Sequence, residues 1–125
     1  MANKVKILIV EDDVDLNGAY HMILSSSGYD VETAFNGREA LDQLAQADEP
    51  PRVIFLDLRM PVMDGLEFLR QYDALKHPDT TVIVFSNYDA QKEVNEAYDL
   101  GADRYVLKAR ATPNELVRIV RDITA

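Results

Sequence analysis

The sequence predicts an α/β domain, built as a doubly wound five-stranded parallel sheet with helices packed against it. Short apolar runs alternate with amphipathic segments five times along the chain. Several of these runs are rich in Val and Ile, which is typical of strands buried on both faces of a parallel sheet. No linker, repeat or low-complexity segment interrupts the alternation, so we expect one domain over residues 1–125.

The expected strands are the apolar runs at 5–10, 30–34, 52–57, 81–86 and 103–108. Right-handed crossovers between parallel strands leave few topologies, and we expect the spatial order 2-1-3-4-5. In such a sheet, ligands bind beyond the carboxyl ends of the strands. The strand pattern therefore predicts the edge of the sheet where a functional site should lie.

Helical spacing and helix-boundary signals occupy the segments between the strands. The fragments "NGRE" (36–39), "DGLE" (64–67) and "TPNE" (112–115) each place a capping residue three positions before Glu, which is typical of a helix start. Pro113 falls at the first helical position, and Gly28 and Gly101 follow helical segments. Apolar residues recur at helical spacing at Leu16, Ala19, Tyr20 and Ile23, at Ala40, Leu41 and Leu44, at Val94, Ala97 and Tyr98, and at Leu116, Ile119, Val120 and Ile123.

The composition excludes several classes of protein. The formal net charge is −9, so non-specific binding to nucleic acid or to an anionic membrane is disfavoured. The absence of cysteine excludes disulfides and thiolate metal sites. No apolar run approaches the roughly 20 residues that span a bilayer, and the N-terminus lacks a signal-peptide pattern. We therefore expect a cytoplasmic protein with no membrane insertion and no direct contact with nucleic acid.

Polar residues stand at the ends of four expected strands. Glu11, Asp12 and Asp13 follow the first strand, Asp57 ends the third, Ser86 ends the fourth and Lys108 ends the fifth. If these strands are neighbours, the side chains converge on one crevice, where clustered carboxylates repel one another. A divalent cation removes that conflict, and a set of ligands made of oxygen alone favours Mg²⁺.

The position of Asp57 suits covalent chemistry. A carboxylate can attack phosphorus and form an aspartyl phosphate. Lys108 adds a positive charge suited to a phosphoryl group, and together with Mg²⁺ it would neutralise the oxygens during transfer. The sequence therefore predicts phosphoryl transfer to Asp57.

With the fragments "ILIVEDD" and "DLRMPVMDG", and with Ser86, Tyr105 and Lys108 in order, the chain resembles the receiver domains of bacterial two-component response regulators. The resemblance covers essentially the whole chain and implies a flavodoxin-like (βα)5 fold of the chemotaxis-receiver kind. It also implies a phosphorylation-dependent switch that takes a phosphoryl group from a sensor histidine kinase with Mg²⁺. Such a module catalyses only its own phosphorylation and dephosphorylation, so we do not expect an enzyme.

The resemblance implies a role for each matching residue. It makes Asp57 the phosphoacceptor and Lys108 the partner of the phosphoryl group. Asp12 would bind the metal directly, Glu11 through water and Arg59 through its backbone carbonyl. Ser86 would supply the hydroxyl that bonds a phosphoryl oxygen, and Tyr105 would be the aromatic switch. The downstream protein would bind the face around the fifth strand and its flanking helices. The last helical pattern reaches Ile123, so no output domain is expected within the chain. The sequence does not decide whether the protein forms a homodimer.

Two departures from the family pattern affect these expectations. The matching lysine is usually followed by a cis proline, whereas Ala109 follows Lys108 here. A cis bond before a residue other than proline costs about 3 kcal/mol, so we predict a trans bond and a shifted loop. Asn87 replaces the usual alanine after the hydroxyl residue. It could crowd the phosphoryl site, and Arg59 and Tyr88 could alter the lifetime of the acyl phosphate by screening water.

Three other functions are alternatives to the switch. A Mg²⁺-dependent phosphatase of the haloacid dehalogenase type normally has a second Asp two positions after its nucleophile, where this chain has Arg59. A pseudo-receiver that never takes phosphate stays an alternative because of Ala109 and Asn87. A flavin carrier is disfavoured because no phosphate-binding Gly/Ser/Thr loop follows the first strand.

Five further residues receive structural interpretations. Asp13 is expected to cap the first helix, because acids favour helix N-termini. His21 and His77 lack catalytic companions nearby in sequence, so we expect surface or structural roles. Met60 and Met63 are expected to pack around the turn after the third strand.

Overall fold

The computed structural model describes residues 4–86 and 91–125 and contains one parallel sheet of five strands. The strands are β1 (Lys6–Val10), β2 (Asp30–Ala34), β3 (Val53–Asp57), β4 (Thr81–Ser86) and β5 (Arg104–Leu107). Their spatial order is β2-β1-β3-β4-β5, with every neighbouring pair parallel. The predicted fold class and strand order are therefore confirmed.

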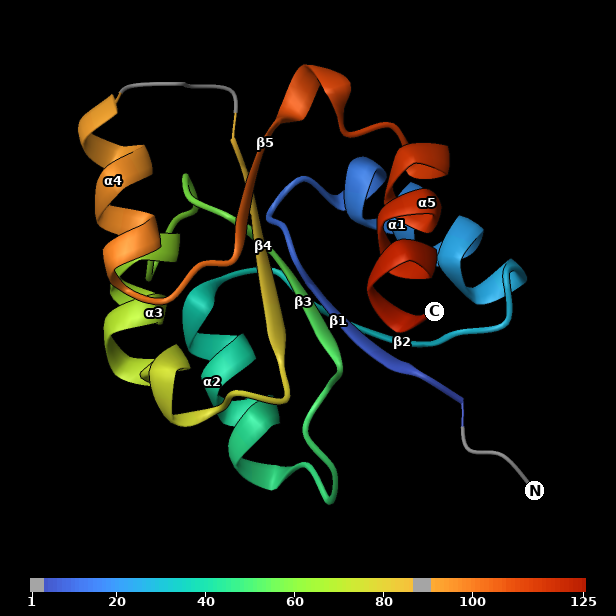
Figure 1. Cartoon of the computed structure of the whole chain (residues 1–125), viewed down its shortest axis with the longest axis horizontal. Coiled ribbons are helices and arrows are strands. Elements are labelled where there is room, and N and C mark those ends of the chain that lie inside the picture. Colours follow the sequence, from blue (N-terminus) through green and yellow to red (C-terminus); the bar gives the residue numbers. More distant parts are fainter. Residues whose placement is uncertain (1–3, 87–90) are drawn as a thin grey trace.

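Five helices cover the two faces of the sheet. They are α1 (Val14–Ser26), α2 (Gly37–Gln46), α3 (Gly65–Tyr72), α4 (Gln91–Asp99) and α5 (Pro113–Thr124). Figure 1 shows α1 and α5 on one face, with α2, α3 and α4 on the other. Short 3₁₀ turns at Ala74–Lys76 and Lys108–Arg110 complete the secondary structure of the described ranges.

The strands divide the core into two layers because successive side chains point to opposite faces. Ile9 and Phe55 belong to the layer beneath α1 and α5, which also contains Tyr20, Leu24, Leu116 and Val120. Leu8 and Leu56 belong to the opposite layer, with Ala40, Phe68, Leu69 and Ala97 from the other three helices. The central strands are buried on both faces, which explains why their sequences are almost entirely apolar.

The predicted helix boundaries are present in the structure. The side chains of Asn36, Asp64 and Thr112 each accept a hydrogen bond from the backbone N–H three residues later. Asp13 caps α1 in the same way, at 3.0 Å from the nitrogen of Leu16, as predicted. Gly28 and Gly101 follow α1 and α4 with φ angles of +97° and +106°, a conformation that favours glycine.

The end of β5 differs from the expected strand. We predicted a strand over 103–108, but β5 ends at Leu107, and Lys108 begins a 3₁₀ turn. The Asp103 carboxylate accepts a hydrogen bond from the backbone nitrogen of Val82 at 2.8 Å, before β5 begins. The described ranges contain no cis peptide bond, so the Lys108–Ala109 bond is trans, as predicted.

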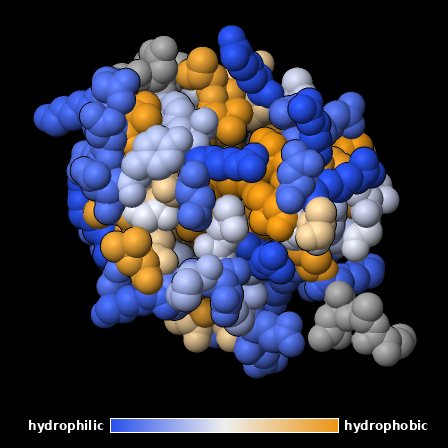
Figure 2. Space-filling view, in the orientation of Figure 1, coloured by the Kyte–Doolittle hydropathy of each residue, from blue (hydrophilic) through white to orange (hydrophobic). Residues whose placement is uncertain are grey.

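The surface agrees with an acidic, globular chain. Figure 2 shows a largely hydrophilic face with hydrophobic patches scattered between charged side chains. Among the helices that the structure describes, none has both the length and the apolar character needed to cross a bilayer.

Candidate functional site

Asp57 lies at the carboxyl end of the central strand β3. It pairs in register with Phe85 of β4 and is 2% exposed. The backbone nitrogen of Arg59 donates a hydrogen bond to Asp57 Oδ1 at 3.2 Å, which fixes one carboxylate oxygen. The other oxygen faces the crevice beyond the strand ends, where ligands bind in this fold.

Gly65 allows α3 to begin directly against the end of β3. Its nitrogen donates to the carbonyl of Leu58 at 3.0 Å. A Cβ at Gly65 would stand 2.5 Å from the carbonyl oxygen of Asp57, so no other residue fits without moving the strand end. Met60 and Met63 pack against the core beside this turn, as predicted. The Asp-Gly pair therefore holds the backbone of Asp57 in place.

Val62 occupies a strained backbone conformation at the same turn. Its φ angle is +67°, which is unfavourable for a β-branched residue, and its side chain is 81% exposed. Because the side chain is exposed, it makes no core contacts that would offset this strain. The chain therefore tolerates a locally unfavourable residue in the loop between β3 and α3.

The acid pair follows β1 on the neighbouring strand. Glu11 is fully buried and Asp12 is exposed. One carboxylate oxygen from each of Glu11, Asp12 and Asp57 lies within 4.8 Å of the others. The structure therefore brings together three of the residues that the sequence nominated as metal ligands. The fourth, Arg59, lies two residues after Asp57, and its guanidinium forms an ion pair with Glu93 of α4.

Lys108 enters the crevice from the turn after β5. Its Nζ donates to Glu11 Oε1 at 2.6 Å and to Asp57 Oδ2 at 3.0 Å, and its side chain is 14% exposed. It also lies 5.9 Å from the centre of the Phe85 ring. The ammonium thus bridges the two buried carboxylates, although the chain has Ala109 rather than proline after it.

These contacts shift the protonation of the buried groups. Burial, followed by the neighbouring carboxylate of Asp57, raises the pKa of Glu11 from 4.5 to about 8, against the opposing effect of Lys108. Burial alone would lower the pKa of Lys108, but its hydrogen bonds to Glu11 and Asp57 outweigh this effect and raise it. Ionisation of Glu11 beside Asp57 is therefore unfavourable even with Lys108 in contact, and Glu11 keeps its proton up to about pH 8.

The donor set fits a hard divalent cation. Three carboxylates face one ammonium, and all the ligand atoms are oxygens, which Mg²⁺ prefers. Glu11 Oε2 is buried and has no hydrogen-bond partner within the described part of the chain. Without a cation this carboxyl retains its proton, as the raised pKa of Glu11 indicates, and a divalent cation or its bound water would displace that proton and contact the oxygen.

Ser86 and Tyr105 lie on the next two strands of the sheet. Ser86 is fully buried at the end of β4, one residue beyond the partner of Asp57. Tyr105 is half-buried, pairs with Val84 and packs against the core layer beneath α4. Asn87 and Tyr88, which the sequence analysis placed beside the site, lie outside the described residues.

The two histidines stand apart from the acid cluster. Both are exposed, His21 on α1 and His77 after the 3₁₀ turn at Ala74–Lys76. The ring of His77 stacks on Tyr72 at 4.4 Å between centroids. This placement agrees with the surface or structural roles predicted for them.

Sequence reasoning missed two residues that make buried polar contacts behind the crevice. Asn17 Nδ2 donates to the carbonyls of Glu11 at 2.9 Å and Ala34 at 3.2 Å. The Tyr20 hydroxyl donates to the carbonyl of Ala111 at 2.8 Å and so ties α1 to the segment after Lys108. A polar residue on the buried stripe of α1, three positions before Tyr20, was the available signal for Asn17.

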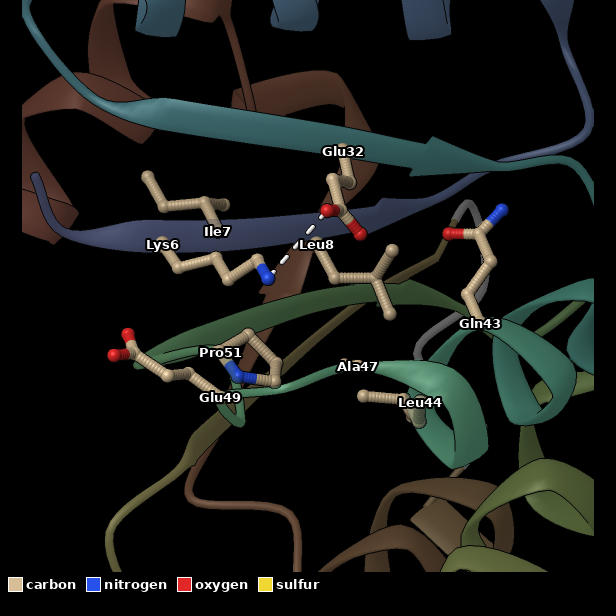
Figure 3. Close-up of a pocket in the computed structure, with 9 residues that line it drawn as sticks. All are labelled: Lys6, Ile7, Leu8, Glu32, Gln43, Leu44, Ala47, Glu49 and Pro51. Carbon is tan, nitrogen blue, oxygen red and sulfur yellow. Dashed lines mark ion pairs between the residues drawn. The ribbon is translucent and has the colours of Figure 1, made fainter.

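A small pocket lies near the amino end of β1, away from the acid cluster. It is formed by residues at the start of β1, from β2 and from the end of α2, with Lys6 and Glu32 forming an ion pair across it (Figure 3). Its volume is about 10 Å³, which admits one water at most. This pocket is therefore too small for a ligand.

Known proteins are similar to this chain in sequence. Residues 7–121 match the response regulator receiver domain family. The response regulator MprA of Mycolicibacterium vanbaalenii is 40% identical over 115 residues, which make up 92% of this chain and 48% of that protein. The chain thus spans about half the length of the curated relatives it matches.

Solved structures agree with the sequence relatives. A CheY-like receiver domain protein of Methanospirillum hungatei has a TM-score of 0.85 at 28% identity, with 96% of this chain and 93% of that one covered. The BeF3-activated receiver domain of DrrB, a Thermotoga maritima protein, has a TM-score of 0.81 at 27% identity, with 98% of both chains covered. The chain therefore belongs to the receiver domains of two-component response regulators.

Proposed function

We propose that this receiver domain is a phosphorylation-controlled switch whose phosphoacceptor is Asp57. The observation that supports it most is the position of the Asp57 carboxylate, buried at the end of β3 and bonded to Lys108 at 3.0 Å. Only a few ångströms separate it from the acid pair. A nucleophile, a cationic partner and a cluster of metal-binding oxygens therefore share one crevice.

The transfer step needs only Asp57, the phosphohistidine of the partner kinase and a proton from water. An oxygen of Asp57 attacks the phosphorus of a phosphohistidine on the partner kinase, forming a P–O bond as the P–N bond breaks. The electron pair of the broken bond stays on the imidazole nitrogen, which takes up a proton. Lys108 lies within reach of the incoming phosphoryl oxygens and lowers the energy of the charge they carry.

Asp12 and Asp57 would hold Mg²⁺ directly, Glu11 through water and Arg59 through its backbone carbonyl. Bound Mg²⁺ would supply positive charge to the phosphoryl oxygens, since transfer depends mainly on positioning and electrostatic stabilisation. The orphaned oxygen of buried Glu11 supports this assignment. The exposed carboxylate of Asp12 is open to a cation from solvent.

The signal would leave the site through β4 and β5. Ser86 stands at the end of β4, and its hydroxyl would bond the phosphoryl group. Tyr105 on β5 would then change its burial. A ligand shifts such an equilibrium only by its differential affinity for the two states, and a swing from 1:99 to 99:1 needs about 5.5 kcal/mol.

The downstream partner would bind the face around β5, α4 and α5. A groove on this face is lined by Val94 of α4, Tyr105 of β5 and Arg110 of the following turn. A change in Tyr105 would alter this groove directly. A second copy of the chain could use the same face, which would give a homodimer.

Arg59 would influence the lifetime of the phosphorylated state. Its backbone contacts Asp57, while its guanidinium pairs with Glu93 of α4, and from these contacts we infer that the side chain covers one side of the crevice. We expect this cover to slow the approach of water. Unchanged dephosphorylation in Arg59→Asn would contradict that role.

The proposal is tested by phosphorylating the protein in vitro. The chain is incubated with acetyl phosphate, with and without Mg²⁺, and intact mass spectrometry measures the added phosphoryl group. Beryllofluoride, which activates the DrrB receiver domain, serves as a non-covalent probe by NMR. We expect modification that requires Mg²⁺ and is lost in Asp57→Asn.

Asp73→Asn is the matched control, because Asp73 is an acid outside the crevice in a left-handed conformation that Asn tolerates. This variant should be modified like the parent. If the parent is not modified and its NMR spectrum does not change with beryllofluoride, the pseudo-receiver is favoured. Multiple-turnover hydrolysis of small phosphate esters would favour the phosphatase.

A further inference from the structure

A buried amide lies directly behind the acid pair. Asn17 on α1 is 1% exposed, although the positions around it on the buried stripe of that helix are apolar. Its Nδ2 donates to the carbonyl of Glu11 at 2.9 Å and to the carbonyl of Ala34, the last residue of β2, at 3.2 Å. One side chain thus joins α1 to the ends of two strands.

These bonds fix the backbone on both sides of Glu11. The nitrogen of Glu11 donates to the carbonyl of Ala34 at 3.0 Å, which holds the peptide before it. Asn17 holds the carbonyl of Glu11, which belongs to the peptide shared with Asp12. Because a planar peptide sets the direction of the bonds at its two ends, the orientation of both acidic residues depends on this contact.

The fold has other means of holding α1. Asp13 caps its N-terminus, and Tyr20 and Leu24 are fully buried against the sheet. The β1–β2 ladder is complete from Lys6 to Val10 without any side chain. The amide of Asn17 instead acts at the three-residue loop between β1 and α1, where the two acids stand.

We propose that Asn17 is a positioning residue for the divalent cation: its amide orients the Glu11–Asp12 peptide so that both carboxylates face the crevice before the cation arrives. The inference rests on the proposed Mg²⁺ site and assigns a role to a residue that touches neither cation nor phosphate. Residues that orient metal ligands typically contribute about 10- to 100-fold in metal affinity. We expect a loss of about tenfold when this amide is removed.

The test compares Mg²⁺ affinity with stability in matched variants. Asn17→Ala removes the amide and leaves room for water to solvate the two carbonyls. The control is Thr80→Val, which removes another buried side-chain bond, from Thr80 Oγ1 to the carbonyl of Pro51 at 2.7 Å. That bond lies just before β4 begins, at the amino ends of the strands, whereas the acids stand at their carboxyl ends. Each lost bond should lower the free energy of unfolding by about 1 kcal/mol.

Mg²⁺ is titrated into the full chain and followed by calorimetry and by the amide NMR shifts of Glu11, Asp12 and Asp57. Asn17→Ala should bind about tenfold more weakly, and its Glu11 and Asp12 amides should shift even without Mg²⁺. Thr80→Val should bind like the parent although it also loses stability, by about half as much as Asn17→Ala, since it loses one bond and Asn17→Ala loses two. This contrast separates positioning from general destabilisation.

Equal affinity in Asn17→Ala and the parent would overturn the inference, and so would an equal loss in Thr80→Val. If Asn17→Ala does not fold, Asn17→Ser, which keeps a hydroxyl donor, replaces it and should show a smaller loss of affinity. A parent chain that binds no Mg²⁺ would instead refute the proposed metal site. The failures of the two proposals are therefore distinguishable.

Discussion

Lys108 is the residue on which the charge balance of the crevice depends. Its ammonium contacts both Glu11 and Asp57, so it opposes a second cation as well as attracting a phosphoryl group. We predict that Lys108→Ala lowers the rate of phosphorylation from acetyl phosphate by about a hundredfold or more, as the loss of a preorganised donor does in other sites. Mg²⁺ affinity should not fall, because a repelling charge is removed. Weaker Mg²⁺ binding in this variant would show that Lys108 organises the acids.

Glu11 should make stability depend on pH. Its pKa of about 8 in the folded chain, against 4.5 when exposed, means that it holds a proton between these values which the unfolded chain has lost. The free energy of unfolding should therefore fall as pH rises from about 5 to about 8 in metal-free buffer. Asp57, Asp12 and Lys108 surround the group, and they stay in place in Glu11→Gln.

Urea unfolding across this pH range, with a chelator present, measures the effect. Glu11→Gln cannot titrate at this position, so its stability should decline less than that of the parent. The two curves should therefore converge or cross as the pH approaches 8. Parallel curves for parent and variant would contradict the raised pKa of Glu11.

The sequence alone identified the residues of the site, but it did not identify the backbone groups to which side chains such as Asn17 donate. Asp57 and Lys108 could be placed because parallel strands bring their carboxyl ends to one edge, whatever the details of packing. Asn17 donates to two carbonyls, and every residue offers the same carbonyl, so no pairing rule identifies its partner. Its polarity on a buried stripe was visible, but the contact needed the fold.

Helix α4 is held differently from the other helices. Of its nine residues, all within the described ranges, Ala97 alone is buried, whereas α5 buries four. Two ion pairs join α4 to its neighbours, Arg59 with Glu93 and Arg70 with Glu96. Because exposed ion pairs contribute about 0–1 kcal/mol, α4 is the helix least secured by packing.

We predict that the amides of α4 exchange with solvent through a local opening of lower free energy than those of α5. Packing protects α5 through Leu116 and Val120, which only global unfolding exposes. Native-state hydrogen exchange at increasing urea measures both openings. Glu96→Gln should lower the opening free energy of α4 by less than about 1 kcal/mol and leave α5 unchanged. Equal protection of the two helices would contradict the prediction.

The sequence predicted the central strands better than the end of β5. Strands β1, β3 and β4 are buried on both faces, so uninterrupted apolar residues mark them. β5 stands at the edge of the sheet and is half-exposed, and nothing in "YVLKARA" distinguishes a strand that ends at Leu107 from one that continues. The turn at Lys108–Arg110 follows from tertiary contacts such as the bond between Tyr20 and the carbonyl of Ala111.

The site joins segments that are distant in sequence. Glu11 follows β1, Asp57 ends β3 and Lys108 follows β5, so the crevice exists only when the complete sheet has formed. The unfolded chain has no such cluster and should bind Mg²⁺ far more weakly. Binding at the crevice should therefore stabilise the entire fold through linkage.

We predict that Mg²⁺ raises the free energy of unfolding by about 2.7 kcal/mol when its concentration is about a hundredfold above the dissociation constant. Asp12→Asn should abolish most of this gain, because Asp12 is the exposed ligand and no described helix cap or ion pair depends on it. Sodium chloride at matched ionic strength is the control, since a net charge of −9 makes any salt somewhat stabilising. Urea unfolding followed by circular dichroism gives both values. If sodium chloride stabilises the parent as much as Mg²⁺ does, the cation acts by screening, and the three carboxylates do not form a specific site.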